Sequence, residues 1–297
     1  MRYSHSPRLL CGLLLAAVVP MAAVAQSEPA PKPFPYPVTG WVQDKAGHVD
    51  PSAMRLMAFQ VGEIAPWSDL RKEMPEVYDQ GSLGSCTGQG LAAIFDHAWR
   101  KYLESKGLRK RWLSPSRLFV YYEERVREGT IDEDAGAQIR TGIDVLAEVG
   151  VCRESRWPYR IERWRSRPPE KAYGEAPMYG VLHGYKLALG DGKSVRVALT
   201  SGRPVVFGAL LYSGMGKITP RDTLLEMPRK GERPQGGHCM VIVGHDDAAK
   251  TYLVRNSWGW RWGDGGHFRM PYAYLNDRIA GDGWVVDAVG GLCGQDE

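Results

Sequence analysis

The sequence predicts an α+β fold with two subdomains that face each other across a cleft. Apolar residues recur at steps of three and four in the first half of the chain, which is typical of buried helices. Short apolar runs bounded by turn residues follow in the second half and indicate β-strands. Helices followed by strands are typical of α+β proteins. The 297 residues, of which 43% are apolar, suffice for one large domain or two smaller ones with a buried core.

The first 25 residues have the pattern of a secretory signal peptide. Arg2 and Arg8 precede an apolar run at 9–19, and residues 23–25 are the small residues that a signal peptidase reads. The run is shorter than the roughly 17 apolar residues that a membrane-spanning helix needs. We therefore favour a signal peptide over a membrane anchor, and we expect a secreted or periplasmic protein without membrane contact after cleavage.

Residues 26–66 are predicted to form an N-terminal extension, and residues 67–297 are predicted to form the packed domain. Proline fixes φ and lacks a backbone donor, so prolines at alternating positions favour an extended segment. They are Pro29, Pro31, Pro33, Pro35 and Pro37. The extension could lie in the cleft or pack outside it, and the sequence leaves both open.

A buried helix is predicted to start at Cys86. Its apolar positions share one helical face. They are Leu91, Phe95, Ala98, Trp99 and Tyr102. The glycines and serines before Cys86 suit a tight loop, and Ser82 or Ser85 could cap the helix.

Two further helices and three strands follow. The helices are expected at 114–127, with Pro115 in the first turn, and at 138–149, with Gly150 as the stop. The strands are expected at 204–210, 240–243 and 252–254, the last two joined by a turn at 246–250.

Three residues could form a nucleophilic site. Cys86 lies at a helix start, where unpaired backbone N–H groups favour the thiolate and lower the pKa of a cysteine. His238 follows two glycines and precedes an apolar run, so it could act as a base at a strand edge. Asn256 ends another strand-like run and could orient the imidazole.

Three segments resemble the signature blocks of papain-like cysteine peptidases, in that family's order. They are residues 80–86, Gly237-His238 with the apolar run after it, and residues 256–259. The resemblance implies the papain-like fold, in which a helical subdomain and a β-barrel-like subdomain face each other across an active-site cleft. Gly40-Trp41 and residues 150–152 are similar to the bacterial secreted branch of the family.

The resemblance implies a role for each catalytic candidate. A Cys86 thiolate paired with the His238 imidazolium would attack a peptide carbonyl and form a covalent acyl-enzyme. Asn256 would fix the tautomer of the imidazole. The side-chain amide of Gln80 and the backbone N–H of Cys86 would form an oxyanion hole, where each donor is typically worth about 3 to 4 kcal/mol.

The same resemblance implies substrate-binding positions. Gly136 and Ala137 belong to a strip that pairs with substrate backbone, Gly237 precedes the histidine, and Trp258 would shield the bond between imidazole and amide from water. The implied partners are peptide or protein substrates and, if it enters the cleft, the chain's own extension. That extension is too short for the long helical propeptide of many relatives.

Two features depart from the family pattern. Leu83 stands where the family has a structural cysteine, so the bridge made by that cysteine is missing. His238 follows Cys86 by 152 residues, beyond the roughly 130 to 150 typical of papain relatives. We therefore expect an insertion, part of it at 217–235.

The cysteines allow at most one disulfide bridge if one thiol stays free for chemistry. Four remain after signal cleavage, namely Cys86, Cys152, Cys239 and Cys293. Cys239 is interpreted as a small buried strand residue, and a bridge to Cys152 or Cys293 is the alternative.

Other function classes lack support. The net charge of +4 is small for this length and does not indicate a nucleic-acid-binding surface. Residues 214–218 lack the complete phosphate-loop pattern, and no zinc-ligand spacing is present. We expect no cofactor, no metal and no nucleic-acid partner. The alternatives are another thiol acyl-transfer enzyme, such as a transglutaminase or amidase, and a catalytically silent binding protein with the papain fold.

Overall fold

The computed structural model of the protein describes residues 36–38, 40–44, 63–108, 112–190 and 192–292. The predicted signal peptide at 1–25, most of the extension at 26–66 and Cys293 lie outside the described residues. The boundaries of the signal peptide, the extension and the packed domain therefore stay predictions.

The described residues form five α-helices and seven β-strands. The helices are α2 (Cys86–Ser105), α3 (Arg117–Glu128), α4 (Ile139–Glu148), α5 (Glu170–Glu175) and α6 (Lys193–Thr200). The strands are β1 (Trp67–Asp69), β2 (Gly180–Leu187), β3 (Val205–Leu211), β4 (Gly236–Asp246), β5 (Thr251–Arg255), β6 (His267–Pro271) and β7 (Ala280–Gly290).

Helix α2 starts at Cys86, as predicted, and buries the face that carries Leu91, Phe95 and Trp99. The expected serine cap is wrong. Ser85 occupies the N-cap position, but its side chain makes no capping hydrogen bond. Its hydroxyl is instead engaged by the Tyr159 hydroxyl at 2.6 Å, so that it ties the helix start to a distant loop.

Helices α3 and α4 lie within or close to the predicted ranges. The expected place of Pro115 in the first turn of α3 is wrong, because the helix starts at Arg117 and Pro115 precedes it. Ser116 occupies the N-cap, and its side chain accepts a hydrogen bond from the Phe119 N–H at 3.2 Å. Helix α4 ends before Gly150, whose φ of 80° confirms the predicted stop.

The strands form one antiparallel sheet in the order β2-β7-β3-β4-β5-β6, and β1 also pairs with β4. Strands β3, β4 and β5 cover the three predicted runs. The α+β prediction is confirmed, although the sheet is not closed, since the end strands β2 and β6 do not pair within the described residues. Strand β2 packs on α4 instead, and β7 packs on α2.

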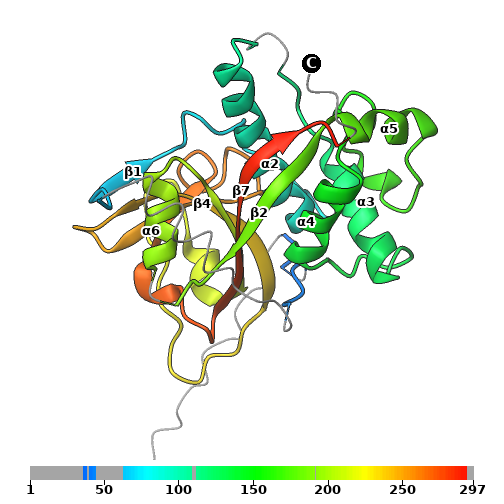
Figure 1. Cartoon of the computed structure of the whole chain (residues 1–297). Helices are drawn as coiled ribbons and strands as arrows, with labels where there is room; N and C mark the ends of the chain where they lie inside the picture. Colours follow the sequence, from blue (N-terminus) through cyan, green and yellow to red (C-terminus); the bar gives the residue numbers. More distant parts are fainter. Residues whose placement is uncertain (1–35, 39, 45–62, 109–111, 191, 293–297) are drawn as a thin grey trace, which may run out of the picture. The chain divides into compact units, whose positions relative to one another are not determined.

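Helix α2 connects the helical side to the sheet. Figure 1 shows α3, α4 and α5 on one side, β1, β4 and α6 on the other, and β2 and β7 running between them. Helix α2 packs against α3 and α4, and also against β4 and β7. The first residue of α2, Cys86, therefore lies where helices and sheet meet.

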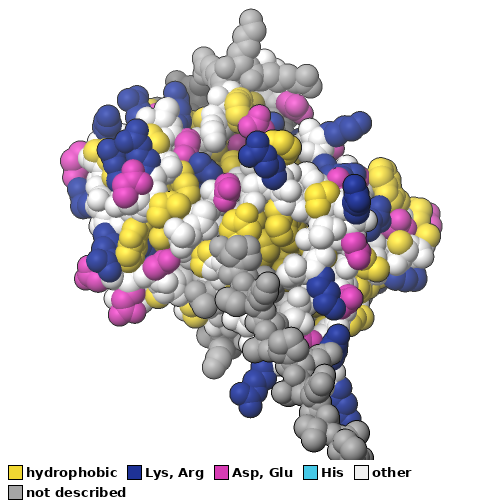
Figure 2. Space-filling model, turned by 180° about the vertical axis from the view of Figure 1, so that it is seen from behind, with side chains coloured by type: hydrophobic (Ala, Val, Ile, Leu, Met, Phe, Trp, Pro, Cys, Tyr) yellow, Lys and Arg dark blue, Asp and Glu magenta, His cyan; other side chains and the backbone are white. Residues whose placement is uncertain are grey.

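The surface mixes both signs of charge. On the face in Figure 2, Lys and Arg side chains lie among Asp and Glu side chains, and hydrophobic side chains gather near the middle. None of the helices in the described ranges is long and apolar enough to cross a bilayer.

Arg125 of α3 is a fully buried cation that holds neighbouring loops. It donates to the carbonyl oxygens of Ile131 at 2.9 Å and Tyr121 at 3.3 Å, and also to that of Trp164. Its guanidinium lies over the Tyr121 ring, 4.3 Å from the centroid. Burial lowers the pKa of Arg125 from its usual value, while the nearby acidic groups Asp134 and Glu124 act in the opposite direction.

We predict that Arg125→Met lowers the free energy of unfolding by about 2 to 4 kcal/mol, because buried carbonyl groups lose their donor. The matched control is Arg127→Met on the same helix, which breaks only an exposed pair with Glu148 and should cost less than about 1 kcal/mol. Urea denaturation measures both. Equal losses in the two variants would contradict the structural role of Arg125.

Candidate active site

The first turn of α2 meets β4 at the Cys86 sulfur. Cys86 is fully buried, and its Sγ accepts a hydrogen bond from the backbone N–H of Cys239 at 3.3 Å. His238, also fully buried, directly precedes Cys239 on β4. The structure therefore brings the predicted nucleophile and base to one place.

The hydrogen bond between His238 and Asn256 defines the tautomer of the imidazole. His238 Nε2 lies 2.8 Å from Asn256 Oδ1. The same Oδ1 accepts the Ser257 N–H at 2.8 Å, which identifies it as the amide oxygen. Because an amide oxygen only accepts, Nε2 carries the proton and Nδ1 keeps its lone pair. Nδ1 has no hydrogen-bond partner among the described residues, so it can accept a proton.

Trp258 covers this pair. The centroids of the Trp258 and His238 rings are 5.0 Å apart. Trp258 and Asn256 are each only 2% exposed. Trp258 therefore has the placement that shielding of the imidazole–amide bond requires.

The side-chain amide of Gln80 is fixed at both ends. Its Oε1 accepts a hydrogen bond from the Ser257 hydroxyl at 2.6 Å, and its Nε2 donates to the Leu83 carbonyl oxygen at 3.0 Å. The backbone N–H of Gln80 also donates to the Ser257 carbonyl at 2.9 Å. An amide nitrogen has two protons, so Gln80 Nε2 keeps a further N–H besides the one that it donates to Leu83.

Asp134 links the loop before Cys86 to the predicted substrate strip. Its carboxylate accepts hydrogen bonds from the Gly84 N–H at 2.9 Å and from the Tyr121 hydroxyl at 2.5 Å. Asp134 lies two residues before Gly136 on the strip. These bonds hold the loop although Leu83 replaces the bridging cysteine of the family.

Part of the N-terminal extension lies in the site. We call residues 36–38 and 40–44 the leader segment. The Ala137 N–H donates to the Gly40 carbonyl at 3.0 Å, and the Val42 N–H donates to the Ala137 carbonyl at 3.0 Å. On the other side, the Trp41 N–H donates to the Gly237 carbonyl at 3.3 Å. The leader segment thus bonds to predicted substrate-binding positions from both halves of the site.

Gly40 passes directly over the nucleophile. A Cβ atom added at Gly40 would lie 2.7 Å from Cys86 Sγ and 2.3 Å from the Gly84 carbonyl oxygen. Both distances are too short for packed atoms, so only glycine fits here. The leader segment therefore lies in the site rather than outside it.

Two contacts fix the ends of the leader segment. The Tyr36 ring stacks on Trp258 with a centroid distance of 4.9 Å. Near the other end, the Asp44 carboxylate pairs with Arg140 at 2.7 Å and with Lys186 at 3.1 Å. An aromatic stack and a buried ion-pair cluster thus hold the segment on either side of Gly40.

Burial under the leader segment keeps both reactive groups uncharged. It raises the pKa of the Cys86 thiol to about 12, although the hydrogen bond from Cys239 favours the thiolate. It lowers the pKa of His238 to about 4. At neutral pH this state therefore holds a thiol and a neutral imidazole rather than an ion pair.

The remaining cysteines are not bridged in the described part of the chain. Cys239 and Cys152 are both free and buried. Cys239 is thus a buried strand residue without a bridge to Cys152, as the first interpretation expects. The possible partner Cys293 lies outside the described residues.

Sequence reasoning misses two residues that hold the site together, Ser257 and Asp134. Ser257 could have been noticed because it lies between Asn256 and Trp258, the two residues of this motif to which the sequence analysis gives a role. Asp134 could have been noticed because it is an acidic residue two positions before Gly136, which is predicted to pair with substrate backbone. Neither position indicates its partner, because Gln80 and Gly84 lie far away in the sequence.

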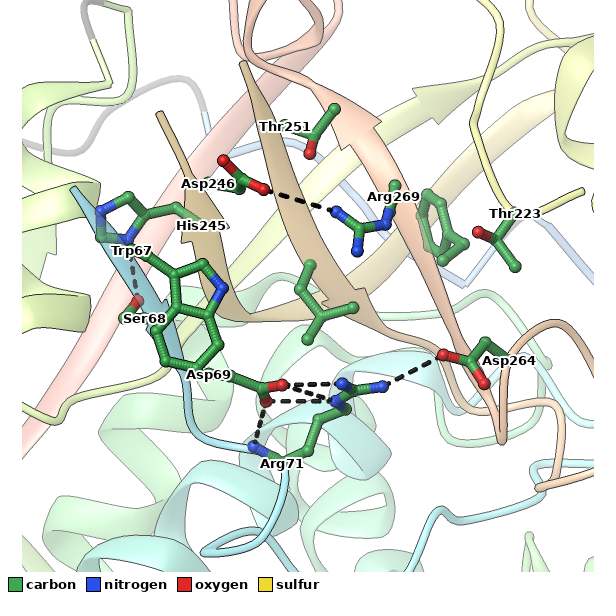
Figure 3. Close-up of a pocket in the computed structure, with 12 residues that line it drawn as sticks. Trp67, Ser68, Asp69, Arg71, Thr223, His245, Asp246, Thr251, Asp264 and Arg269 are labelled. Carbon is green, nitrogen blue, oxygen red and sulfur yellow. Dashed lines mark hydrogen bonds and ion pairs between the residues drawn. The ribbon is translucent and has the colours of Figure 1, made fainter. Parts of the chain in front are cut away.

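A separate pocket of about 140 Å³ lies over β1, β4, β5 and β6 (Figure 3). Arg71 points to Asp69 and Asp264, at 2.7 and 3.1 Å, and Arg269 points to Asp246 at 3.9 Å. His245 also lines this pocket, but both of its ring nitrogens are hydrogen-bonded, one to the Ser68 hydroxyl and one to the Ala65 carbonyl, each at 2.8 Å. Within the described ranges, its imidazole therefore lacks the unpartnered nitrogen that His238 has beside Cys86.

The sequence matches a known family. A family model described as papain family cysteine protease matches residues 64–279. The chain is 40% identical over 235 residues to an uncharacterized peptidase C1-like protein of Acanthamoeba polyphaga mimivirus, with 74% of each protein covered. It is 27% identical over 215 residues to a cathepsin B-like protein of Giardia intestinalis, which covers 68% of this chain and 67% of that protein.

Solved structures share the fold. The chain is similar to xylellain, a cysteine protease from Xylella fastidiosa, with a TM-score of 0.72, 32% identity, and 89% and 99% of the two chains covered. It also resembles proCathepsin B from Trypanosoma congolense, with a TM-score of 0.63, 16% identity, and 83% and 85% covered. The second likeness concerns the fold alone. These descriptions name proteases rather than transglutaminases or amidases.

We predict that His238 stays neutral in the full chain well below its ordinary pKa, because burial disfavours the imidazolium. Nitrogen-15 NMR of labelled histidine should show a protonated Nε2 and an unprotonated Nδ1 at pH 7, and a titration midpoint near 4. The urea-unfolded chain should titrate near the ordinary value of about 6.5. A protonated Nδ1, or the ordinary midpoint in the folded chain, would disprove the assignment.

Proposed function

Because this chain belongs to the papain family of cysteine proteases, we propose that it hydrolyses peptide bonds with Cys86 as nucleophile, His238 as proton carrier and Asn256 as the group that orients His238. One observation carries the proposal. The Cys239 N–H holds the Cys86 sulfur beside a histidine whose Nδ1 is unpartnered among the described residues. A thiol and a base in this relation can form the reactive thiolate.

The first half of the proposed reaction makes an acyl-enzyme. Cys86 gives its proton to His238 Nδ1, and the sulfur forms a bond to the peptide carbonyl carbon. The carbonyl oxygen becomes negative, and the Gln80 side chain and the Cys86 backbone N–H stabilise it. The carbon–nitrogen bond then breaks while the imidazolium returns its proton to the leaving amine.

The second half releases the acyl group. A water molecule gives a proton to His238 and attacks the thioester carbon. The carbon–sulfur bond breaks, the acid product leaves, and Cys86 is regenerated beside the imidazolium. Asn256 keeps Nε2 protonated throughout, so Nδ1 performs each proton transfer.

We also infer that the leader segment inhibits the enzyme until it is displaced or removed. Gly40 covers the sulfur, and the leader segment uses the Ala137 and Gly237 backbone groups that a substrate would need. A proform among the structures with this fold is consistent with such an inhibitory segment. Export through the signal peptide at 1–25 is proposed on its sequence pattern.

The inhibitory role predicts a gain of activity on Gly40→Val in the full chain. Valine would collide with Gly84 and Cys86 and move the leader segment off the sulfur. If the collision destabilises the covered state by more than about 1.4 kcal/mol relative to the exposed state, the exposed fraction of the enzyme rises at least about tenfold, and peptide turnover rises with it. The matched control is Val42→Ala, since Val42 is 39% exposed and should leave turnover unchanged.

The inhibition should depend little on pH in the range where the exposed pair is ionised. The covered site holds a thiol and a neutral imidazole, and the exposed site would hold a thiolate and an imidazolium, so the proton moves from Cys86 to His238 and none is taken up from solution. The ratio of turnover in the Gly40→Val chain to that in the unmodified chain should therefore stay nearly constant between about pH 5 and pH 7. Equal turnover in the two chains at every pH would refute inhibition.

The nucleophile is tested in the Gly40→Val chain. Cys86→Ala should lower peptide hydrolysis by roughly 10⁴-fold or more. The neighbouring thiol of Cys239 cannot replace it, because consecutive side chains of a strand point to opposite faces and Cys239 follows His238 on β4. Cys152→Ala, which removes another buried thiol, should keep activity and serves as the control. Continued cleavage by the Cys86→Ala protein, followed by mass spectrometry, would show that the assignment is wrong.

Gln80→Ala in the same chain tests the oxyanion hole. We expect kcat to fall by about 10²- to 10³-fold with little change in KM, because the lost donor acts on charge that exists only in the transition state. Steady-state kinetics on one peptide separate the two constants. A normal kcat would remove Gln80 from the oxyanion hole.

A further inference from the structure

The indole of Trp41 fills a pocket next to Cys86. The side chain is only 7% exposed, and its Nε1 donates to Asp282 Oδ2 at 3.2 Å. Trp41 follows Gly40, the residue over the sulfur, and consecutive Cα atoms are about 3.8 Å apart. The pocket therefore opens one residue away from the nucleophile, and the proposed mechanism uses none of its side chains.

Missing side chains make room for the indole. A Cβ atom at Gly208 on β3 would lie 1.9 Å from Trp41 Cε2, and one at Gly237 on β4 would lie 2.9 Å from Trp41 Cε3. Both contacts are impossible for packed carbon atoms. Gly281 on β7 pairs with Gly208 in the sheet and continues this wall. The pocket admits a large flat group because these strands carry glycine there.

Asp282 supplies the polar end of the pocket. It is 5% exposed, and its Oδ1 pairs with Lys186 Nζ at 3.2 Å. Its Oδ2 accepts two hydrogen bonds from the leader segment, one from the indole N–H at 3.2 Å and one from the Asp44 backbone N–H at 2.8 Å. Lys186 already balances the carboxylate, and Arg140 lies nearby on Asp44. A cationic side chain of a bound peptide would therefore be repelled by Lys186 and Arg140. A neutral aromatic side chain with an N–H group could donate a hydrogen bond to Asp282 Oδ2.

We propose that this pocket is a specificity pocket that selects substrates with a tryptophan side chain, which Trp41 imitates in the covered enzyme. The inference rests on the proposed function, because a peptide can enter only where the leader segment leaves. Gly208 sets the size of the accepted side chain. Asp282 favours tryptophan over phenylalanine, because displacement of the leader segment removes both the Trp41 and the Asp44 donor from Oδ2 and a phenylalanine side chain replaces neither.

The test uses the full chain with Gly40→Val and Trp41→Ala, which uncovers the sulfur and empties the pocket. This opened chain is incubated with a peptide library that varies every position, and mass spectrometry locates the cleavage sites. At one fixed position relative to the cleaved bond, tryptophan should exceed phenylalanine by about three- to tenfold, the worth of one net hydrogen bond.

Three further variants of the opened chain separate shape from hydrogen bonding. Gly208→Val should abolish the tryptophan preference while peptides with alanine at that position are still cleaved. Asp282→Gly, which tolerates the φ of 52° at this residue, should bring the ratio of tryptophan to phenylalanine near one. Asp282→Asn keeps an acceptor oxygen and should restore the preference. Gly174→Ala is the control, because an added Cβ there meets nothing within 4 Å.

The outcomes distinguish the two claims. If the opened chain cleaves no peptide, the proposed function fails, and the specificity pocket fails with it. If it cleaves peptides without tryptophan enrichment, or if enrichment survives Gly208→Val, the specificity pocket is refuted while the proposed function stands. Thermal melting of each variant confirms that a lost preference does not reflect unfolding.

Discussion

The hydrogen bond from the Cys239 N–H to the Cys86 sulfur is the contact on which the whole site depends. It joins the first turn of α2 to β4, and so joins the helical side of the chain to the sheet. His238 precedes the donor on β4, and Asn256 holds the far nitrogen of its ring. Gln80 anchors the loop that leads into α2. A shift of α2 along β4 would therefore separate the proposed nucleophile from the proposed base and oxyanion donors together.

Burial, rather than a misplaced residue, distinguishes the covered site from the active site that we propose. The bond between His238 and Asn256 is already formed, and the Gln80 amide is already oriented. The leader segment excludes water from the thiol and the imidazole, and both stay neutral because neither charge is solvated. On this account, activation needs the movement of one backbone segment and no rearrangement of the catalytic groups.

The sequence predicts the helix at Cys86, three central strands and the four residues that meet at the site, because periodicity and motif order report on local structure. It does not reveal β2 and β7. Polar and glycine residues such as Lys186 and Asp282 interrupt these strands, and the apolar run of β7 at 284–286 is only three residues long. These strands form because each pairs with a neighbour far away in the sequence. The path of the leader segment is hidden for a similar reason, since its bonds to Ala137 and Gly237 use backbone groups that every residue has.

We propose that exposing Cys86 converts a neutral thiol into a thiolate paired with His238. Alkylation of Cys86 by iodoacetamide in the Gly40→Val chain, followed by peptide mapping over a range of pH, tests this step. We expect rapid alkylation already near pH 6, well below the ordinary thiol pKa of about 8.5, and loss of this reactivity in the His238→Ala variant. Alkylation that rises only around pH 8.5 or above, with or without His238, would contradict it.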